Sequence, residues 1–165
     1  MNNKEEQRVL VANTFTPLYD ELEDRIRVVI NYQDMVNRVD FMITRNFIIN
    51  LMLSVDGYVL QHYGDEFEIE DNVVINNIEK NQTSKNQKSN LEKTDNVNLE
   101  LLKIKDELLI KLDLSYQADT KNTLLVLTSK YCVTKSLLDS NMLIQLIKSI
   151  KSSIPYFKWG ISKSF

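Results

Sequence analysis

A regular alternation of apolar and polar side chains limits what the second half of this chain can fold into. The alternation predicts a strand over 108–117 with one face in water. Its apolar positions are Leu108, Ile110, Leu112, Leu114 and Tyr116. After a turn at 118–122, the apolar and β-branched run 123–132 predicts a central strand. The second half therefore requires a β-sheet.

The first half predicts a helix followed by a hairpin. Thr16-Pro17 is typical of a helix start, and apolar residues recur at helical spacing up to Arg38. We expect a helix over 17–38, although the β-branched run 26–30 alone also fits a strand. Alternation resumes from Phe47 and meets Asp56-Gly57, a strong hairpin signal. A β-hairpin centred on that dipeptide is the expected result.

The ends and the middle of the chain complete the predicted layout. The apolar stripe behind Asp139 predicts a helix over 140–153 that Pro155 stops. Residues 80–96 hold one aliphatic side chain and are read as a mobile polar insertion. The expected fold is α+β, an antiparallel sheet of about five strands with helices packed on its faces. Its domain spans 17–154, between a polar segment 1–16 and a basic aromatic tail 155–165.

The composition excludes most enzyme and membrane classes. With one His, one Cys and three dispersed Gly among 165 residues, the chain lacks the side chains of metal cages and phosphate loops. We read His62 as a strand residue and Cys132 as a small buried hydrophobe. No enzyme activity, catalytic residue, cofactor or metal site is expected. A net charge of −3 argues against nucleic acid as a partner. The missing signal peptide and spanning segment favour a cytoplasmic location.

The order of elements resembles the roadblock/longin-like domain. The resemblance rests on LMLSVDGYVLQHYG in the first hairpin and TLLVLTSKYCVTKSLL before the last helix. It implies a dynein-light-chain-type or Ragulator-type roadblock subunit, a platform that pairs with a similar domain as a homo- or heterodimer and docks on a small GTPase. One departure is the short segment 72–78, where the family has a firm middle helix.

These observations predict an adaptor or scaffold subunit of a cytosolic complex that acts through sheet-edge and helix surfaces. The alternative is a longin-like subunit of a membrane-trafficking tethering or coat complex. Membrane contact is expected to be indirect, on the cytosolic face of an endomembrane. Two apolar stretches without an obvious place in the core give the expected interface, with 72–79 and 98–105 left open between helix and strand. The interface residues are Val73, Val74, Ile75, Ile78, Leu99, Leu101 and Ile104.

Overall fold

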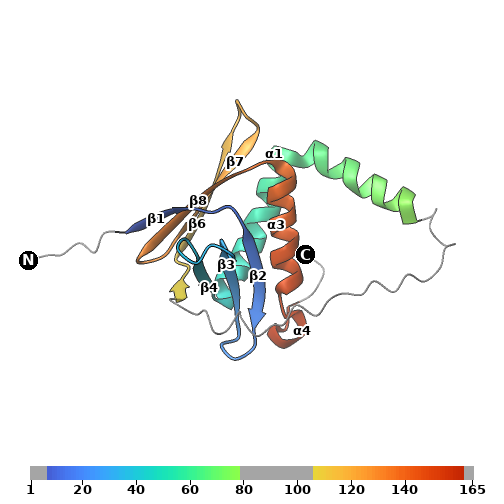
Figure 1. The fold of residues 1–165 in the computed structure, drawn as a ribbon. Helices are drawn as coiled ribbons and strands as arrows, with labels where there is room; N and C mark the ends of the chain where they lie inside the picture. The colour runs from blue at the N-terminus through green and yellow to red at the C-terminus, as the bar shows by residue number, and fades with distance from the viewer. Residues whose placement is uncertain (1–6, 79–105, 162–165) are drawn as a thin grey trace, which may run out of the picture.

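Two four-stranded sheets and the helices beside them form the part of the chain that the structure describes (Figure 1). This computed structural model describes residues 7–78 and 106–161, with side chains described for 7–64 and 107–161. The first sheet has the order β1-β8-β7-β6, with β1 (Arg8–Val11), β8 (Cys132–Leu138), β7 (Asn122–Thr128) and β6 (Lys111–Gln117). The second has the order β2-β3-β4-β5, with β2 (Phe15–Asp20), β3 (Arg25–Ile30), β4 (Val39–Ile43) and β5 (Asp106–Leu108). The helices are α1 (Arg45–Ile78), α3 (Ser140–Ser153) and α4 (Tyr156–Trp159).

The α+β class is confirmed, but the expectation of one antiparallel sheet of about five strands is wrong. Each sheet is mixed, because β1 runs parallel to β8 and β4 runs parallel to β5. Both parallel pairs join segments that lie far apart in the sequence, so no local turn signal announces them. Residues 8–11, which we assigned to a polar segment before the domain, form β1.

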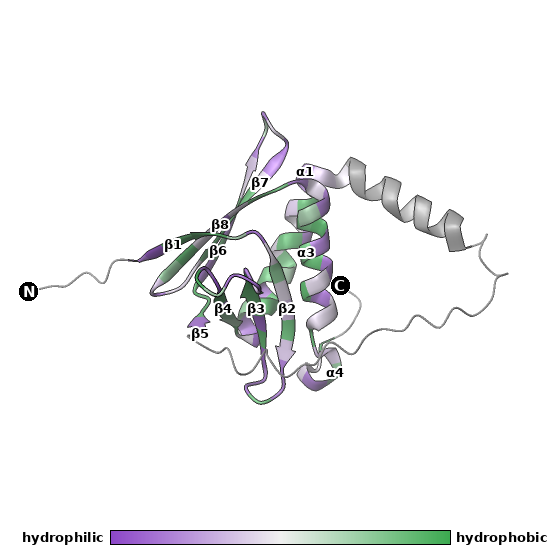
Figure 2. Cartoon of the chain, in the orientation of Figure 1, coloured by the Kyte–Doolittle hydropathy of each residue, from purple (hydrophilic) through white to green (hydrophobic). Residues whose placement is uncertain are grey.

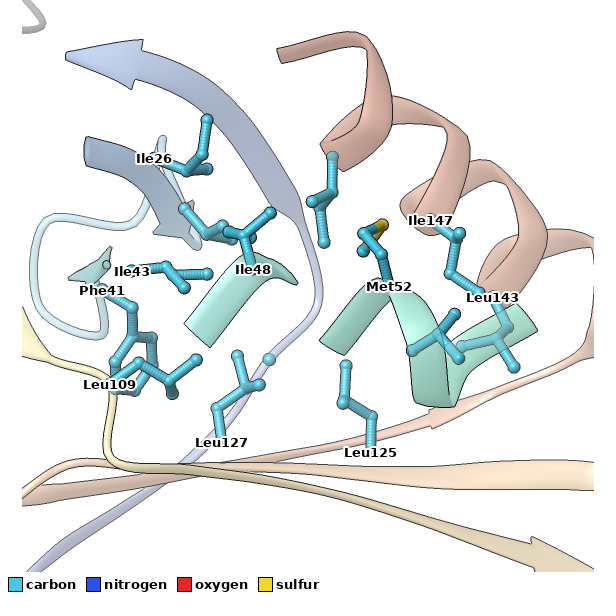
Figure 3. Packing of buried hydrophobic residues seen from close by; sticks show 14 of the residues in the cluster. Ile26, Phe41, Ile43, Ile48, Met52, Leu109, Leu125, Leu127, Leu143 and Ile147 are labelled. Carbon is cyan, nitrogen blue, oxygen red and sulfur yellow. The ribbon is translucent and has the colours of Figure 1, made fainter. Parts of the chain in front are cut away.

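One apolar core connects the two sheets through α1. Ile48 of α1 lies beside Ile26 and Ile43 of the second sheet, and Met52 lies above Leu125 of the first (Figure 3). The helix α3 packs against the same core with alternating hydrophobic and hydrophilic residues along its length (Figure 2). Since α1 contacts both sheets and α3, it is the element around which the core is organised.

The predicted helix over 17–38 is wrong, because this segment forms β2, a turn and β3. The acidic residues that we placed in the first helical turns make the hairpin turn instead. Asp20 Oδ1 accepts the backbone N–H groups of Leu22 (3.1 Å) and Glu23 (3.2 Å), and Asp24 takes the left-handed conformation at φ 51°. Asp favours both roles in turns. Pro17 is accommodated in β2, an edge strand of its sheet.

The predicted hairpin at Asp56-Gly57 is also wrong, because both residues lie within α1. The buried side chains follow helical spacing across the dipeptide: Ile48, Met52, Val55, Val59 and Tyr63. Thr44 begins the helix, since its Oγ1 accepts the N–H of Phe47 at 3.3 Å and its carbonyl accepts the N–H of Ile48.

In the second half of the chain, the observed elements agree better with those predicted from the sequence. Strand β6 and the turn before β7 are confirmed, and α3 spans the predicted 140–153. The strand predicted over 123–132 ends at Thr128, because residues 129–131 turn the chain into β8, which we had not predicted. The predicted strand start is wrong as well: Leu108 and Ile110 are exposed while Leu109 is buried.

Two further predictions lie outside the described residues. They are the polar insertion at 80–96 and the segment 98–105, for which helix and strand were left open.

Candidate functional site

The first sheet has apolar side chains on both of its faces. Its inner face, with Leu125 and Leu127, lies in the core. On the opposite side, strands β1, β8 and β7 present a second apolar set, which we call the outer apolar face. Its members are Val9, Val11, Leu124, Val126, Val133 and Leu137.

The outer apolar face remains open to solvent. Val9 is 62% exposed, Val11 67% and Leu137 50%, while Leu124 and Val126 are half-buried by their neighbours in the sheet. The helices of the core pack on the other side of this sheet (Figure 1). Contiguous apolar surface of this kind is typical of protein-binding sites.

The charges on this side of the sheet are few. Lys135 lies between Val11 and Val126 in the register of the strands. At the β6 edge, Lys111 and Asp113 form an exposed ion pair at 2.8 Å. Apolar side chains therefore surround Lys135 on this face, and polar side chains border it along β6. A mainly apolar patch with a polar rim is typical of protein interfaces.

A groove between α1 and α3 is a second surface feature. It has a volume of about 340 Å³ and an apolar floor that includes Val59, Ile144 and Ile147. Lys151 Nζ and Asp56 Oδ1 join the two helices by an ion pair at 2.7 Å. Because this pair is partly exposed, it orients the helices more than it stabilises them.

The single histidine takes part in an aromatic cluster. His62 on α1 stacks on Tyr116 of β6, with ring centroids 4.5 Å apart, and lies 4.6 Å from the ring of Tyr58. The hydroxyls of Tyr58 and Tyr63 both lie within hydrogen-bond distance of Thr123 Oγ1, at 2.9 and 2.7 Å. The cluster fastens the middle of α1 to strands β6 and β7, and the strand placement that we predicted for His62 is wrong.

Cys132 is buried, as predicted. Burial raises the pKa of its thiol, which disfavours the reactive thiolate. Nearby, Ser129 Oγ donates to Glu107 at 2.8 Å and accepts the N–H of Cys132 at 2.9 Å. These bonds stabilise the turn between β7 and β8. In the described parts of the chain, no group of His, Cys, Asp and Glu side chains is placed to hold a metal ion.

The basic aromatic tail folds back onto the domain in part. Trp159 is buried, and its Nε1 donates to Asp24 Oδ1 at 2.7 Å. Phe157, two residues earlier, is 98% exposed.

The interface expected from the sequence lies outside the described side chains, both in its part within α1 and in its part at 99–104. The structure therefore does not test this expected interface, which stays a prediction. The residues are Val73, Val74, Ile75, Ile78, Leu99, Leu101 and Ile104.

The outer apolar face was missed by the sequence reasoning. One signal was available, because Leu124 and Val126 alternate with Leu125 and Leu127, so that β7 is apolar on both sides. We had read this run only as a central strand. The contribution of β1 had no signal, since its parallel partner β8 lies more than a hundred residues away in the sequence.

No family model, curated protein or solved structure matches this chain. Among the described residues, no helix is long and apolar enough to cross a membrane.

Proposed function

We propose that this chain is a non-enzymatic adaptor subunit of a cytosolic multiprotein complex and binds a protein partner through the outer apolar face. The observation that carries the proposal is the exposure of Val9, Val11 and Leu137 on one side of a single sheet. Burying such side chains against a partner removes apolar surface from water, which favours association. The partner classes are those that the resemblance suggested, a similar domain or a small GTPase.

Two further features support a binding role. The one histidine is engaged by tyrosine rings, and the one cysteine is buried and held in its thiol form. The sheet that carries the face is rigid, because each of its strand pairs shares a continuous register and its other side is packed into the core. A rigid apolar surface loses little conformational entropy on binding.

The proposal is tested by the native mass of the complex that a tagged chain forms in the cells that make it. Wild type should be recovered with a different protein bound. Leu137→Asp places a charge on the face, beside Leu124, and should reduce the amount of bound protein at least about tenfold, because burying a charge against the partner is costly. Leu22→Asp, at an equally apolar position that is 90% exposed in the β2–β3 turn, is the matched control and should keep it.

Circular dichroism and a thermal scan establish that both variants fold. If Leu137→Asp folds and retains the partner to the same extent as Leu22→Asp, the outer apolar face is not the binding surface and the proposal is wrong.

A further inference from the structure

The register of the first sheet places a lysine in the middle of the outer apolar face. Lys135 of β8 lies opposite Val11 of β1 on one side and opposite Val126 of β7 on the other. Val133 and Leu137 lie two residues before and after it along β8, and so on the same side of the sheet. An exposed lysine therefore stands among aliphatic side chains in both directions.

The ammonium group of Lys135 has no partner within the part of the chain that the structure describes, because it makes no hydrogen bond or ion pair there. In its row of the sheet, one carboxylate is present, that of Asp113, which lies opposite Val126 and so two strands away. Asp113 is already paired, since Lys111 Nζ lies 2.8 Å from its Oδ1. The charge of Lys135 therefore remains available to a binding partner.

A partner that covers this face has to remove water from Lys135 as well as from the aliphatic side chains around it. An unpaired ammonium group taken out of water costs more free energy than the burial of one aliphatic side chain returns. The nearest edge of the sheet lies beyond Val11, so the lysine reaches water there only by lying across that valine, which the partner would then not contact. The charge therefore restricts which surfaces can bind.

We infer that the protein partner presents an aspartate or glutamate side chain, set in an apolar patch, that pairs with Lys135. This inference deepens the proposed function and rests on it, because it gives the chemistry of the surface that the outer apolar face selects. The carboxylate accepts hydrogen bonds from the ammonium group, while the apolar patch covers the neighbouring valines. A protein with an apolar patch alone leaves the lysine buried and unpaired, so it binds more weakly.

The charge on the face suits a carboxylate better than a phosphate group. One ammonium group balances one carboxylate, whereas a phosphorylated side chain carries a charge of about −2 and requires further cations. The next lysine on this side of the sheet is Lys111, and its ammonium group is held by Asp113. An unmodified acidic side chain is therefore the partner group that matches Lys135.

The test compares two substitutions at position 135 of the full chain, with the protein that wild type recovers from cells as the binding partner. Lys135→Met keeps a long flexible side chain and removes the charge. It should weaken binding at least about tenfold, because the carboxylate of the partner is then buried without a cation. Lys135→Glu should weaken binding at least about a hundredfold, since two carboxylates then face each other.

The direction of the change in Lys135→Met decides the question. If the partner had no carboxylate at this point, the same substitution would remove a desolvation cost and binding would become tighter. Tighter or unchanged binding by Lys135→Met therefore overturns the inference. Lys148→Met is the matched control, because Lys148 is an exposed lysine on α3, away from this sheet, and its replacement should leave the affinity unchanged. A thermal scan establishes that all three variants fold.

A zero-length cross-link provides a second readout. A carbodiimide joins an amine directly to a carboxylate and takes up the water that is lost, so only groups in contact are linked. The treated complex should contain an amide bond between Lys135 Nζ and one aspartate or glutamate of the partner, which peptide mass spectrometry locates. A complex that forms and shows no such bond at Lys135 contradicts the inference.

The two proposals fail in different ways. If Leu137→Asp loses the partner and Lys135→Met binds it more tightly, the carboxylate is wrong and the outer apolar face is still the binding surface. If wild type recovers no protein, or Leu137→Asp keeps its partner, the proposed function is wrong and this inference is wrong with it.

Discussion

Asn31 shows how one buried amide fixes the position of three segments. Its Oδ1 accepts the N–H groups of Asn13 at 2.8 Å and Thr14 at 3.4 Å. Its Nδ2 donates to the carbonyls of Val11 at 2.8 Å and Asn37 at 3.2 Å. The residue is 4% exposed and has φ 53°, a left-handed conformation that asparagine tolerates better than most residues. It holds the end of β1 against the loop that follows β3.

Asn31→Gly should lower the free energy of unfolding by about 2 kcal/mol, because backbone groups lose a buried partner while the left-handed conformation stays accessible. Asn31→Ala should lose roughly 1 kcal/mol more, since alanine adds the steric cost of that conformation. Urea denaturation measures both changes. Equal stability of the two variants and wild type would contradict the role given to the side chain.

The contact between Tyr19 and Asp24 predicts that the phenol of Tyr19 titrates at an unusually high pH. The hydrogen bond from the Tyr19 hydroxyl to Asp24, with burial as a smaller cause, raises the pKa of Tyr19 to about 12 from its ordinary value of 10. The folded state therefore holds the phenol neutral, so this contribution to stability is complete below pH 10 and is lost as the pH rises through about 12. The absorbance titration of wild type, minus that of Tyr19→Phe, isolates this group. Asp24→Asn should return its pKa toward 10.

The same contact acts in the opposite direction on Asp24. Hydrogen bonds from Tyr19 and then Trp159 hold the pKa of this carboxyl below its usual value of 3.8. Its contribution to stability is therefore present above that value and is lost as the pH falls through the lower, folded-state pKa. An Asp24 carboxyl that titrates by NMR at or above 3.8 would contradict the contact.

Among the elements, α1 shows why sequence patterns can mislead. Residues 47–53 are apolar at nearly every position, so both the period of a strand and that of a helix fit them. The longer segment 48–63 decides between the two, because its buried positions keep helical spacing over several turns. The Asp-Gly signal is local, and tertiary packing overrides it.

Where patterns were long and bounded by caps, they predicted elements well. Helix α3 begins after Asp139, whose side chain accepts the N–H of Met142 at 2.8 Å, and it ends before Pro155. Strand β6 keeps one wet face over its whole length. By contrast, β2 and β3 were missed because their acidic turn also suits the first turns of a helix.

Gly57 distinguishes the helix from the predicted hairpin. In α1 the residue is exposed, and a Cβ added there meets no atom within 4 Å. Gly57→Ala should therefore raise the free energy of unfolding by about 0.5–1 kcal/mol, since alanine loses less backbone entropy in a helix. Thermal denaturation measures this change in the free energy of unfolding.

The matched control is Gly160→Ala. Gly160 ends α4 at φ 65°, which an alanine adopts only with strain, so that variant should lose stability. Destabilisation by Gly57→Ala would favour the turn instead of the helix.

At the scale of the whole molecule, the class of the fold was predictable and its division into two sheets was not. Periodicity reports which side of a strand is buried, but it carries no information on which distant strand lies alongside. The antiparallel pairs form β2-β3-β4 and β6-β7-β8. The parallel pairs β1–β8 and β4–β5 each join segments on either side of α1 and add the fourth strand to each sheet. The outer apolar face could not be located without them, because β1 contributes two of its most exposed members.

The central claim is that a protein partner lies on the outer apolar face. It is tested most directly by a photo-cross-linking residue placed at Leu137, in cells. The control position is Leu22, a leucine that is more exposed (90% against 50%) and lies away from this sheet. Mass spectrometry then identifies what each position captures. We expect position 137 to capture a specific second protein and position 22 to capture none. Capture of that protein at position 22 and not at 137 would contradict the claim.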